Sequence, residues 1–214
     1  MWIFLRKGCS PFSMIISMFK ILSVTNRCLC RGNFAERTAE IARAGADGII
    51  LREKDLGESA YEALSREVLA GCRDQLILHS FTETAKVLQV PRMHLPLPLL
   101  RVLSLQQRQD FAVLGASCHS LQDVQEAEDL GCTYVTLGHI FATDCKKGLP
   151  PRGLAFLEEI AGKSSLPVYA IGGIGRANIR LTREAGASGA CIMSGLMVCE
   201  DPGEELKLLR NALK

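Results

Sequence analysis

Three features that mark other classes of protein are missing from this sequence of 214 residues. It has no block of five or six Lys or Arg residues and a net charge of only +2, so a nucleic-acid partner is not predicted. No apolar run approaches the roughly 18 residues that a transmembrane helix needs. The basic pair near the start follows an apolar run, which is the wrong order for a signal peptide. We therefore expect a cytoplasmic protein with no membrane partner.

A cysteine framework is also missing, although the chain has nine cysteines. They are scattered, and no two form a C-x-x-C pair. Cys28 and Cys30 lie close together, but no histidine or second cysteine pair is near them, as a zinc site requires. The pattern indicates a reduced interior in which most cysteines are small apolar side chains.

The composition predicts one sizeable globular domain, because 48% of the residues are hydrophobic and 22% are charged. We expect residues 1–20 to be an extension outside the fold and residues 21–214 to form the domain. Within it, eight short apolar runs are continuous rather than alternating, which is typical of parallel strands covered on both faces. The predicted strands are residues 21–25, 48–52, 76–79, 92–95, 112–117, 134–139, 167–171 and 190–194.

Helical patterns lie between these strands, and several end in a glycine just before the next strand, as at Gly45, Gly131 and Gly186. Strands that alternate with helices of this length predict βαβ units and a parallel sheet. Eight units without a linker favour a single (β/α)₈ TIM barrel, with an open doubly wound sheet as the alternative. The predicted helices are residues 34–44, 59–72, 82–88, 121–130, 154–161, 177–185 and 204–213, with a weaker one at 104–109.

A barrel directs attention to the C-terminal ends of its strands, where active sites of this fold lie. Arg52 ends the second strand and Lys54 lies just after it, where the two could hold an anionic substrate. Ser117 ends the fifth strand. His139 ends the sixth, and an imidazole that titrates near neutrality is suited to moving a proton in both directions.

Anion binding is predicted next to this histidine and at the last two strands. Thr143 and Lys146 lie in the loop after the sixth strand. Gly172 and Gly173 follow the seventh strand, where a backbone without side chains can approach a ligand and lead into a helix N-terminus. Met193 and Ser194 end the eighth strand, and the loops after strands seven and eight are the usual phosphate site of such barrels.

Carboxylates are missing at two other strand ends. The third strand ends in His79 and Ser80, and the fourth runs into "PLPLL". His94 lies inside the fourth strand and is expected to be structural. Because Mg²⁺ prefers hard oxygen ligands, the sequence predicts no metal site here.

The stretches "LREKD", "GASCHS", "GHIFATDCKKGLPPRG", "AIGGIG" and "CIMSG" occur in order at these strand ends. Together they resemble the thiamine phosphate synthase / thiazole tautomerase (TenI) superfamily of small (β/α)₈ proteins in thiamine biosynthesis. The resemblance extends from Ile21 to Lys214. It implies a small-molecule phosphate ester as substrate, is compatible with a homo-oligomer, and assigns no role to Cys145.

The two branches of that superfamily imply different chemistries. Synthases couple a pyrimidine pyrophosphate to a thiazole phosphate with Mg²⁺, and they carry a glutamine where this chain has Ile50, an Asn-Asp pair at His79 and Ser80, and an aspartate in the loop that reads "PLPLL" here. The tautomerase branch has Gly-His where this chain has Gly138 and His139, and where synthases have Gly-Pro.

The resemblance therefore favours an isomerase, a thiazole tautomerase without a cofactor. Its phosphate would lie on Gly173, Met193, Ser194 and Thr143. His139 would move the proton that makes the thiazole carboxylate phosphate aromatic. The alternatives are thiamine phosphate synthase, a Mg²⁺-dependent transferase, and a non-catalytic regulatory protein that binds a phosphate ligand.

Overall fold

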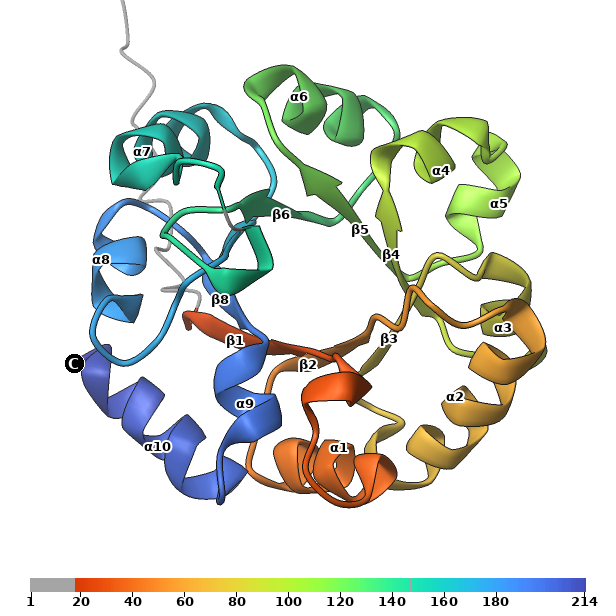
Figure 1. Ribbon diagram of the computed structural model, residues 1–214. Coiled ribbons are helices and arrows are strands. Elements are labelled where there is room, and N and C mark those ends of the chain that lie inside the picture. Colours follow the sequence, from red (N-terminus) through yellow and green to blue (C-terminus); the bar gives the residue numbers. More distant parts are fainter. Residues whose placement is uncertain (1–17, 147) are drawn as a thin grey trace, which may run out of the picture.

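Eight parallel strands form a closed barrel in the order β1 to β8 in the computed structural model, which describes residues 18–146 and 148–214 (Figure 1). β8 returns to pair with β1, with Ile21 opposite Ala190, so the predicted (β/α)₈ barrel is confirmed and the open sheet is excluded. The strands are β1 Lys20–Val24, β2 Gly48–Leu51, β3 Leu76–His79, β4 Arg92–Pro96, β5 Val113–Cys118, β6 Tyr134–Gly138, β7 Val168–Ile171 and β8 Gly189–Ile192.

The expected N-terminal extension falls mostly on residues 1–17, which lie outside the described residues, as does the side chain of Cys145. Lys20, the last residue of that expected extension, is already the first residue of β1 and pairs with Gly189. The strand therefore begins one residue earlier than the sequence predicts.

Helices surround the barrel as an outer ring (Figure 1). Two of them were not predicted. α4 occupies the "PLPLL" segment. Pro98 lies in its first turn, where a backbone N–H would have no partner within the helix, so its missing N–H costs no helical hydrogen bond. α9 begins at Ser194, so β8 stops at Ile192 and the predicted strand is too long. The α-helices are α1 Phe34–Arg43, α2 Glu58–Cys72, α3 Thr82–Val87, α4 Leu97–Val102, α5 Leu105–Gln109, α6 Leu121–Asp129, α7 Gly153–Lys163, α8 Ile179–Glu184, α9 Ser194–Val198 and α10 Pro202–Ala212, and two 3-10 helices are η1 Arg27–Leu29 and η2 Asp144–Lys146.

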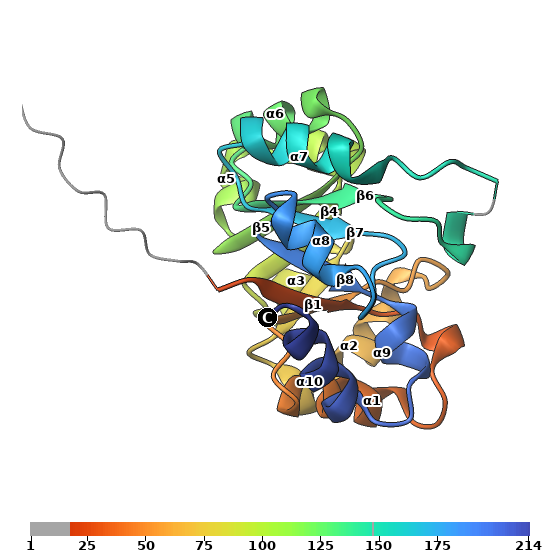
Figure 2. The same cartoon turned by 90° about the vertical axis from the view of Figure 1, so that its left-hand side faces the viewer.

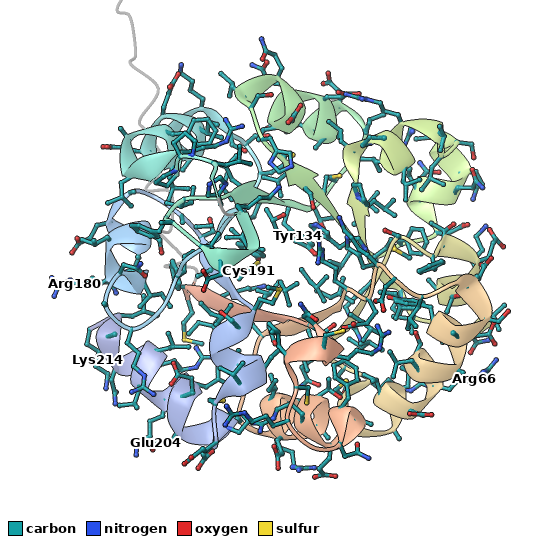
Figure 3. The ribbon with its side chains drawn as sticks, viewed as in Figure 1. Arg66, Tyr134, Arg180, Cys191, Glu204 and Lys214 are labelled. Carbon is teal, nitrogen blue, oxygen red and sulfur yellow. The ribbon has the colours of Figure 1, made fainter. Side chains whose placement is uncertain are left out.

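The core has two parts, one on each side of the sheet. The larger lies between the strands and the helices. The smaller fills the barrel interior and includes Tyr134, Tyr169 and Cys191. Figure 3 shows Tyr134 and Cys191 inside the barrel, whereas Arg66 lies at its outer edge. Gly115 on β5 makes room for this packing, because a Cβ there would collide with the ring of Tyr134.

The C-terminal ends of the strands form one mouth of the barrel. Figure 2 shows the β6–α7 connection projecting from this end, near η1 and α9. Long loops and short helices at one rim are where a barrel of this kind builds its binding site. In the described part of the chain, none of the helices has the length and apolar character needed to cross a membrane.

Candidate active site

A cavity of about 1700 Å³ opens at this mouth. It brings together every site residue that the sequence predicts, although these come from five different strand ends. Their individual roles stay predictions. The predicted residues that line the cavity are Arg52, Lys54, Ser117, His139, Thr143, Lys146, Gly172, Gly173, Met193 and Ser194.

The charged segment after β2 separates its cations from its anions. Arg52 and Lys54 line the cavity, whereas Glu53 is 3% exposed and is held elsewhere. Its carboxylate accepts hydrogen bonds from the Thr25 hydroxyl at 2.6 Å and from the Arg27 backbone at 3.1 Å. The Glu53 carboxylate also pairs with the Arg27 guanidinium at 3.2 Å. Glu53 therefore has a structural role, whereas Arg52 and Lys54 line the mouth of the cavity.

Positive charge accumulates on this side of the cavity. Burial and the neighbouring cations Arg52 and Lys146 hold the pKa of Lys54 below its usual value. Burial, assisted by Arg52 and Lys54, lowers the pKa of His79 to about 3. The imidazole of His79 is therefore neutral at physiological pH, and the positive field comes from Arg52, Lys54 and Lys146. Such a field favours a multiply charged anion.

The residues present do not fit a bound Mg²⁺. Among residues 18–146 and 148–214, no group of three or more His, Cys, Asp and Glu side chains is arranged to hold a metal ion. The two acids of the segment after β2 do not supply one, because Glu53 and Asp55 are both bound by Arg27. The two strand ends that the sequence singled out carry His79 and the helix α4.

His139 lies half-buried at the rim and is fixed by its own loop. Its Nε2 lies 3.3 Å from the carbonyl oxygen of Leu149, which can only accept, so Nε2 is the protonated nitrogen in this arrangement. The backbone of Arg152 donates to the His139 carbonyl oxygen at 3.0 Å. Together these contacts fold the loop back onto the end of β6.

A second rim histidine was missed by the sequence analysis. His119 lines the cavity, and its Nδ1 lies 3.2 Å from the carbonyl oxygen of Gly138, the residue before His139. Its backbone N–H donates to Asp123 at 2.7 Å, which fixes the start of α6. The sequence signal that could have identified His119 is its position directly after β5, one residue beyond Cys118.

Close packing against the β6 loop requires glycine at positions 172 and 173, which the sequence alone did not reveal. Both have positive φ, and a Cβ on Gly172 would collide with His139, while one on Gly173 would collide with the carbonyl oxygen of Ala142. The pair is therefore required for the β6 and β7 loops to pack together. The expected helix N-terminus is not adjacent, because α8 begins only at Ile179 and has six residues. A phosphate role for these loops stays a prediction.

Two histidines line the cavity from β3 and β4. His79 and His94 are paired residues of these strands, and their rings stack with centroids 5.8 Å apart. The sequence predicted a purely structural role for His94, but its Nε2 lies within hydrogen-bond distance of the Ser117 hydroxyl oxygen, at 2.9 Å. It therefore contacts a residue of the candidate site, although the two residues are 23 positions apart in the sequence.

Relatives of this chain are named thiamine-phosphate synthase. One from Roseiflexus sp. (strain RS-1) is 35% identical over 180 residues, which cover 80% of this chain and 75% of the relative. Another from Syntrophomonas wolfei is 28% identical over 208 residues, which cover 92% and 98% of the two chains. The solved thiamine phosphate pyrophosphorylase from Pyrococcus furiosus has a TM-score of 0.77 at 24% identity, covering 92% of this chain and 96% of that one, and supports the fold.

These names contradict the expected isomerase activity and favour a transferase instead. The tautomerase prediction depended on Gly138 and His139 and on the missing carboxylates at two strand ends, and it was wrong because neither feature specifies isomerisation. In the structure the Nε2 of the His139 ring lies 3.3 Å from the Leu149 carbonyl oxygen, in a cavity that Arg52, Lys54 and Lys146 also line. The family described as "Thiamine monophosphate synthase" (TMP-TENI) matches residues 21–196, and the chain belongs to this family.

Proposed function

We propose that this chain is a transferase of the thiamine-phosphate synthase type, which joins a pyrimidine pyrophosphate to a thiazole phosphate. The observation that carries the proposal is a single cavity in which cationic side chains after β2 and β6 lie together with two loops, after β7 and β8, that are predicted to hold phosphate. Arg52, Lys54 and Lys146 line it together with the loops after β7 and β8. Two anionic substrates need two places for their charge within one cavity, and this arrangement offers both.

The reaction is a displacement at the methylene carbon of the pyrimidine. The thiazole nitrogen forms a bond to that carbon while the bond from carbon to the pyrophosphate oxygen breaks, and pyrophosphate leaves with the electron pair. Arg52, Lys54 and Lys146 would stabilise the negative charge that grows on the leaving group. Fixed cations inside a cavity stabilise developing charge better than water does, because they are already oriented.

The thiazole phosphate is assigned to the loops after β6, β7 and β8. Thr143, Gly173, Met193 and Ser194 line the cavity there. Backbone N–H groups and hydroxyls suit a single phosphate, whereas the side chains of Arg52 and Lys54 after β2 suit the more highly charged pyrophosphate. Lys146 is near both groups, because its backbone N–H donates to the Thr143 carbonyl oxygen at 3.0 Å and its charge acts on Lys54.

A second candidate is a protein that binds these phosphate esters without turnover. It is favoured by one observation, the lack of a cluster of metal-binding side chains in the described part of the chain. Without neutralisation by a divalent cation, the three cationic side chains alone must support the departure of pyrophosphate.

A coupled assay separates the two candidates. The purified protein is mixed with pyrimidine pyrophosphate, thiazole phosphate and Mg²⁺, and thiamine phosphate is measured, while calorimetry records the binding of each substrate. We expect turnover in the wild type and a loss of at least tenfold in Arg52→Gln, since one charge-assisted contact is worth about 1.5–3 kcal/mol. Arg66→Gln is the matched control, because Arg66 pairs with Glu62 outside the cavity. Binding of both substrates without product favours the second candidate.

A further inference from the structure

His94 connects the barrel interior to the cavity. Its Nδ1 lies 3.0 Å from the hydroxyl oxygen of Tyr134, and its Nε2 lies 2.9 Å from the hydroxyl oxygen of Ser117. The hydroxyl of Thr136 is also near Nε2, at 3.4 Å. Ser117, Thr136 and His94 line the cavity, whereas Tyr134 lies beneath it. A buried phenol is thus joined through one imidazole to two hydroxyls at the ligand site.

The fold fixes this chain of groups from three neighbouring strands. In the register, His94 on β4 is opposite Gly115 on β5, and Gly115 is opposite Tyr134 on β6. The missing side chain of Gly115 leaves the space that the Tyr134 ring fills. Tyr134 and His94 are 3% and 2% exposed, with ring centroids 5.5 Å apart, so neither ring can turn toward water. Their hydrogen bonds must be made within the protein.

The protonation state follows from counting donors. Burial holds the pKa of His94 well below its usual value and raises that of Tyr134 well above its own, so the imidazole is neutral and the phenol keeps its proton. In the described residues, His94 is the hydrogen-bond partner found for the Tyr134 hydroxyl. A proton on Nδ1 would leave the phenol proton without that acceptor, and an unsatisfied buried donor is costly. Tyr134 therefore donates to Nδ1, and the imidazole proton is on Nε2.

We propose that Tyr134 fixes this tautomer of His94 so that Ser117 acts as a hydrogen-bond donor to the ligand. Nε2–H donates to the oxygen of Ser117, and the serine hydroxyl is then free to direct its own proton into the cavity. The ligand atom that meets Ser117 must carry a lone pair, as an unprotonated ring nitrogen or a phosphoryl oxygen does. The ligand part of this inference rests on the proposed function. His94 is a positioning residue, because it acts through Ser117.

The tautomer is tested first, without any ligand. Long-range ¹H–¹⁵N correlation spectra of the ¹⁵N-labelled protein distinguish a protonated ring nitrogen from a bare one, and loss of the signals in His94→Gln assigns them. We expect the proton on Nε2 and a bare Nδ1. A proton on Nδ1 would overturn the proposal, because Ser117 would then have to donate to His94.

The connection to Ser117 is tested by binding, with thiazole phosphate and pyrimidine pyrophosphate as separate probes. We expect Ser117→Ala to weaken one of the probes about tenfold, and His94→Leu to weaken the same probe but to add little in the Ser117→Ala background. His94→Gln should stay within about threefold of the wild type, since an amide can accept from Tyr134 and donate to Ser117. Tyr169→Phe is the control, because Tyr169 stacks on Tyr134 but does not line the cavity.

If the fold-losses in affinity of His94→Leu and Ser117→Ala multiply in the double variant, the proposal is overturned. A histidine with a purely structural role would weaken binding independently of the serine. An unchanged affinity for both probes in Ser117→Ala would also overturn it. If His94→Leu does not fold, the Gln variant and the spectra still decide. If neither probe binds the wild type, the proposed function fails, whereas the spectra alone uphold or overturn the tautomer.

Discussion

His79 and His94 face each other across β3 and β4, with ring centroids 5.8 Å apart, and both imidazoles are buried and neutral. Burial lowers the pKa of His79 to about 3 and holds that of His94 well below its usual value. Arg52 acts on both rings in the same direction. The floor of the cavity is thus a neutral, hydrogen-bonding surface beneath a positively charged mouth.

Acid should destabilise the protein through these rings. Below pH 6.5 the unfolded chain binds a proton on His79 that the folded protein refuses until about pH 3, so the free energy of unfolding falls as the pH drops through this window. At pH 4.5 the loss from His79 alone is about 3 kcal/mol. Urea unfolding at pH 7 and pH 4.5 measures it. His79→Gln should reduce the difference in unfolding free energy between the two pH values. An unchanged difference in this variant would contradict the assignment to His79.

Removal of the Glu53 carboxylate should damage the fold more than the binding site. Glu53→Ala leaves the Thr25 hydroxyl and the Arg27 backbone without their acceptor and should cost about 2–4 kcal/mol of unfolding free energy. Asp55→Asn is the control, because Asp55 pairs with the same arginine but its side chain is 58% exposed, and this substitution should cost much less than Glu53→Ala. Equal costs in denaturant unfolding would show that the burial of Glu53 has no energetic consequence.

Alkaline pH should weaken anion binding through Lys54. Its pKa lies below 10.5, so its charge is lost at a lower pH than that of an ordinary lysine, and affinity for inorganic pyrophosphate should decline correspondingly early. Lys54→Arg keeps its charge throughout this range and should retain the affinity. Calorimetry from pH 7.5 to 10 compares the two proteins. An identical decline in both would remove Lys54 from the anion site.

The packing between the β6 and β7 loops should be sensitive at Gly173. It has φ of 67°, and a Cβ there would collide with the Ala142 carbonyl oxygen, so Gly173→Ala should cost about 2 kcal/mol or more. Gly175→Ala is the control, because a Cβ on Gly175 would meet no atom within 4 Å and its φ is not in the left-handed region. Thermal unfolding of both variants measures the difference, and an unchanged midpoint for Gly173→Ala would refute the packing argument.

The sequence predicted the barrel because continuous apolar strands and glycine-terminated helices are local signals. It missed α4, whose Pro-Leu-Pro start resembles a loop, and α9, whose first residue it placed at the end of a strand. The residues that it predicted for the site do line one cavity, because strand ends converge in this fold, but it missed His119. It could not predict where neighbouring side chains point. Lys54 lines the cavity, whereas the carboxylate of the adjacent Glu53 accepts a hydrogen bond from Arg27, 26 residues earlier.

The reaction was the part of the prediction that failed. A histidine after β6 and a cationic loop suit proton transfer and anion binding equally well, so residue types alone did not choose between an isomerase and a transferase. The relatives named thiamine-phosphate synthase made the difference. The Ser117–His94–Tyr134 chain was out of reach for another reason, because its members come from three strands and meet only in the closed barrel.

The most direct test of synthase activity is the rate at which the purified protein forms thiamine phosphate from pyrimidine pyrophosphate and thiazole phosphate in Mg²⁺ buffer, relative to buffer alone. We predict catalytic turnover with release of one pyrophosphate for each product, reduced at least about tenfold in Arg52→Gln and unchanged in Arg66→Gln. Product at the buffer rate, with both substrates shown to bind, would contradict it.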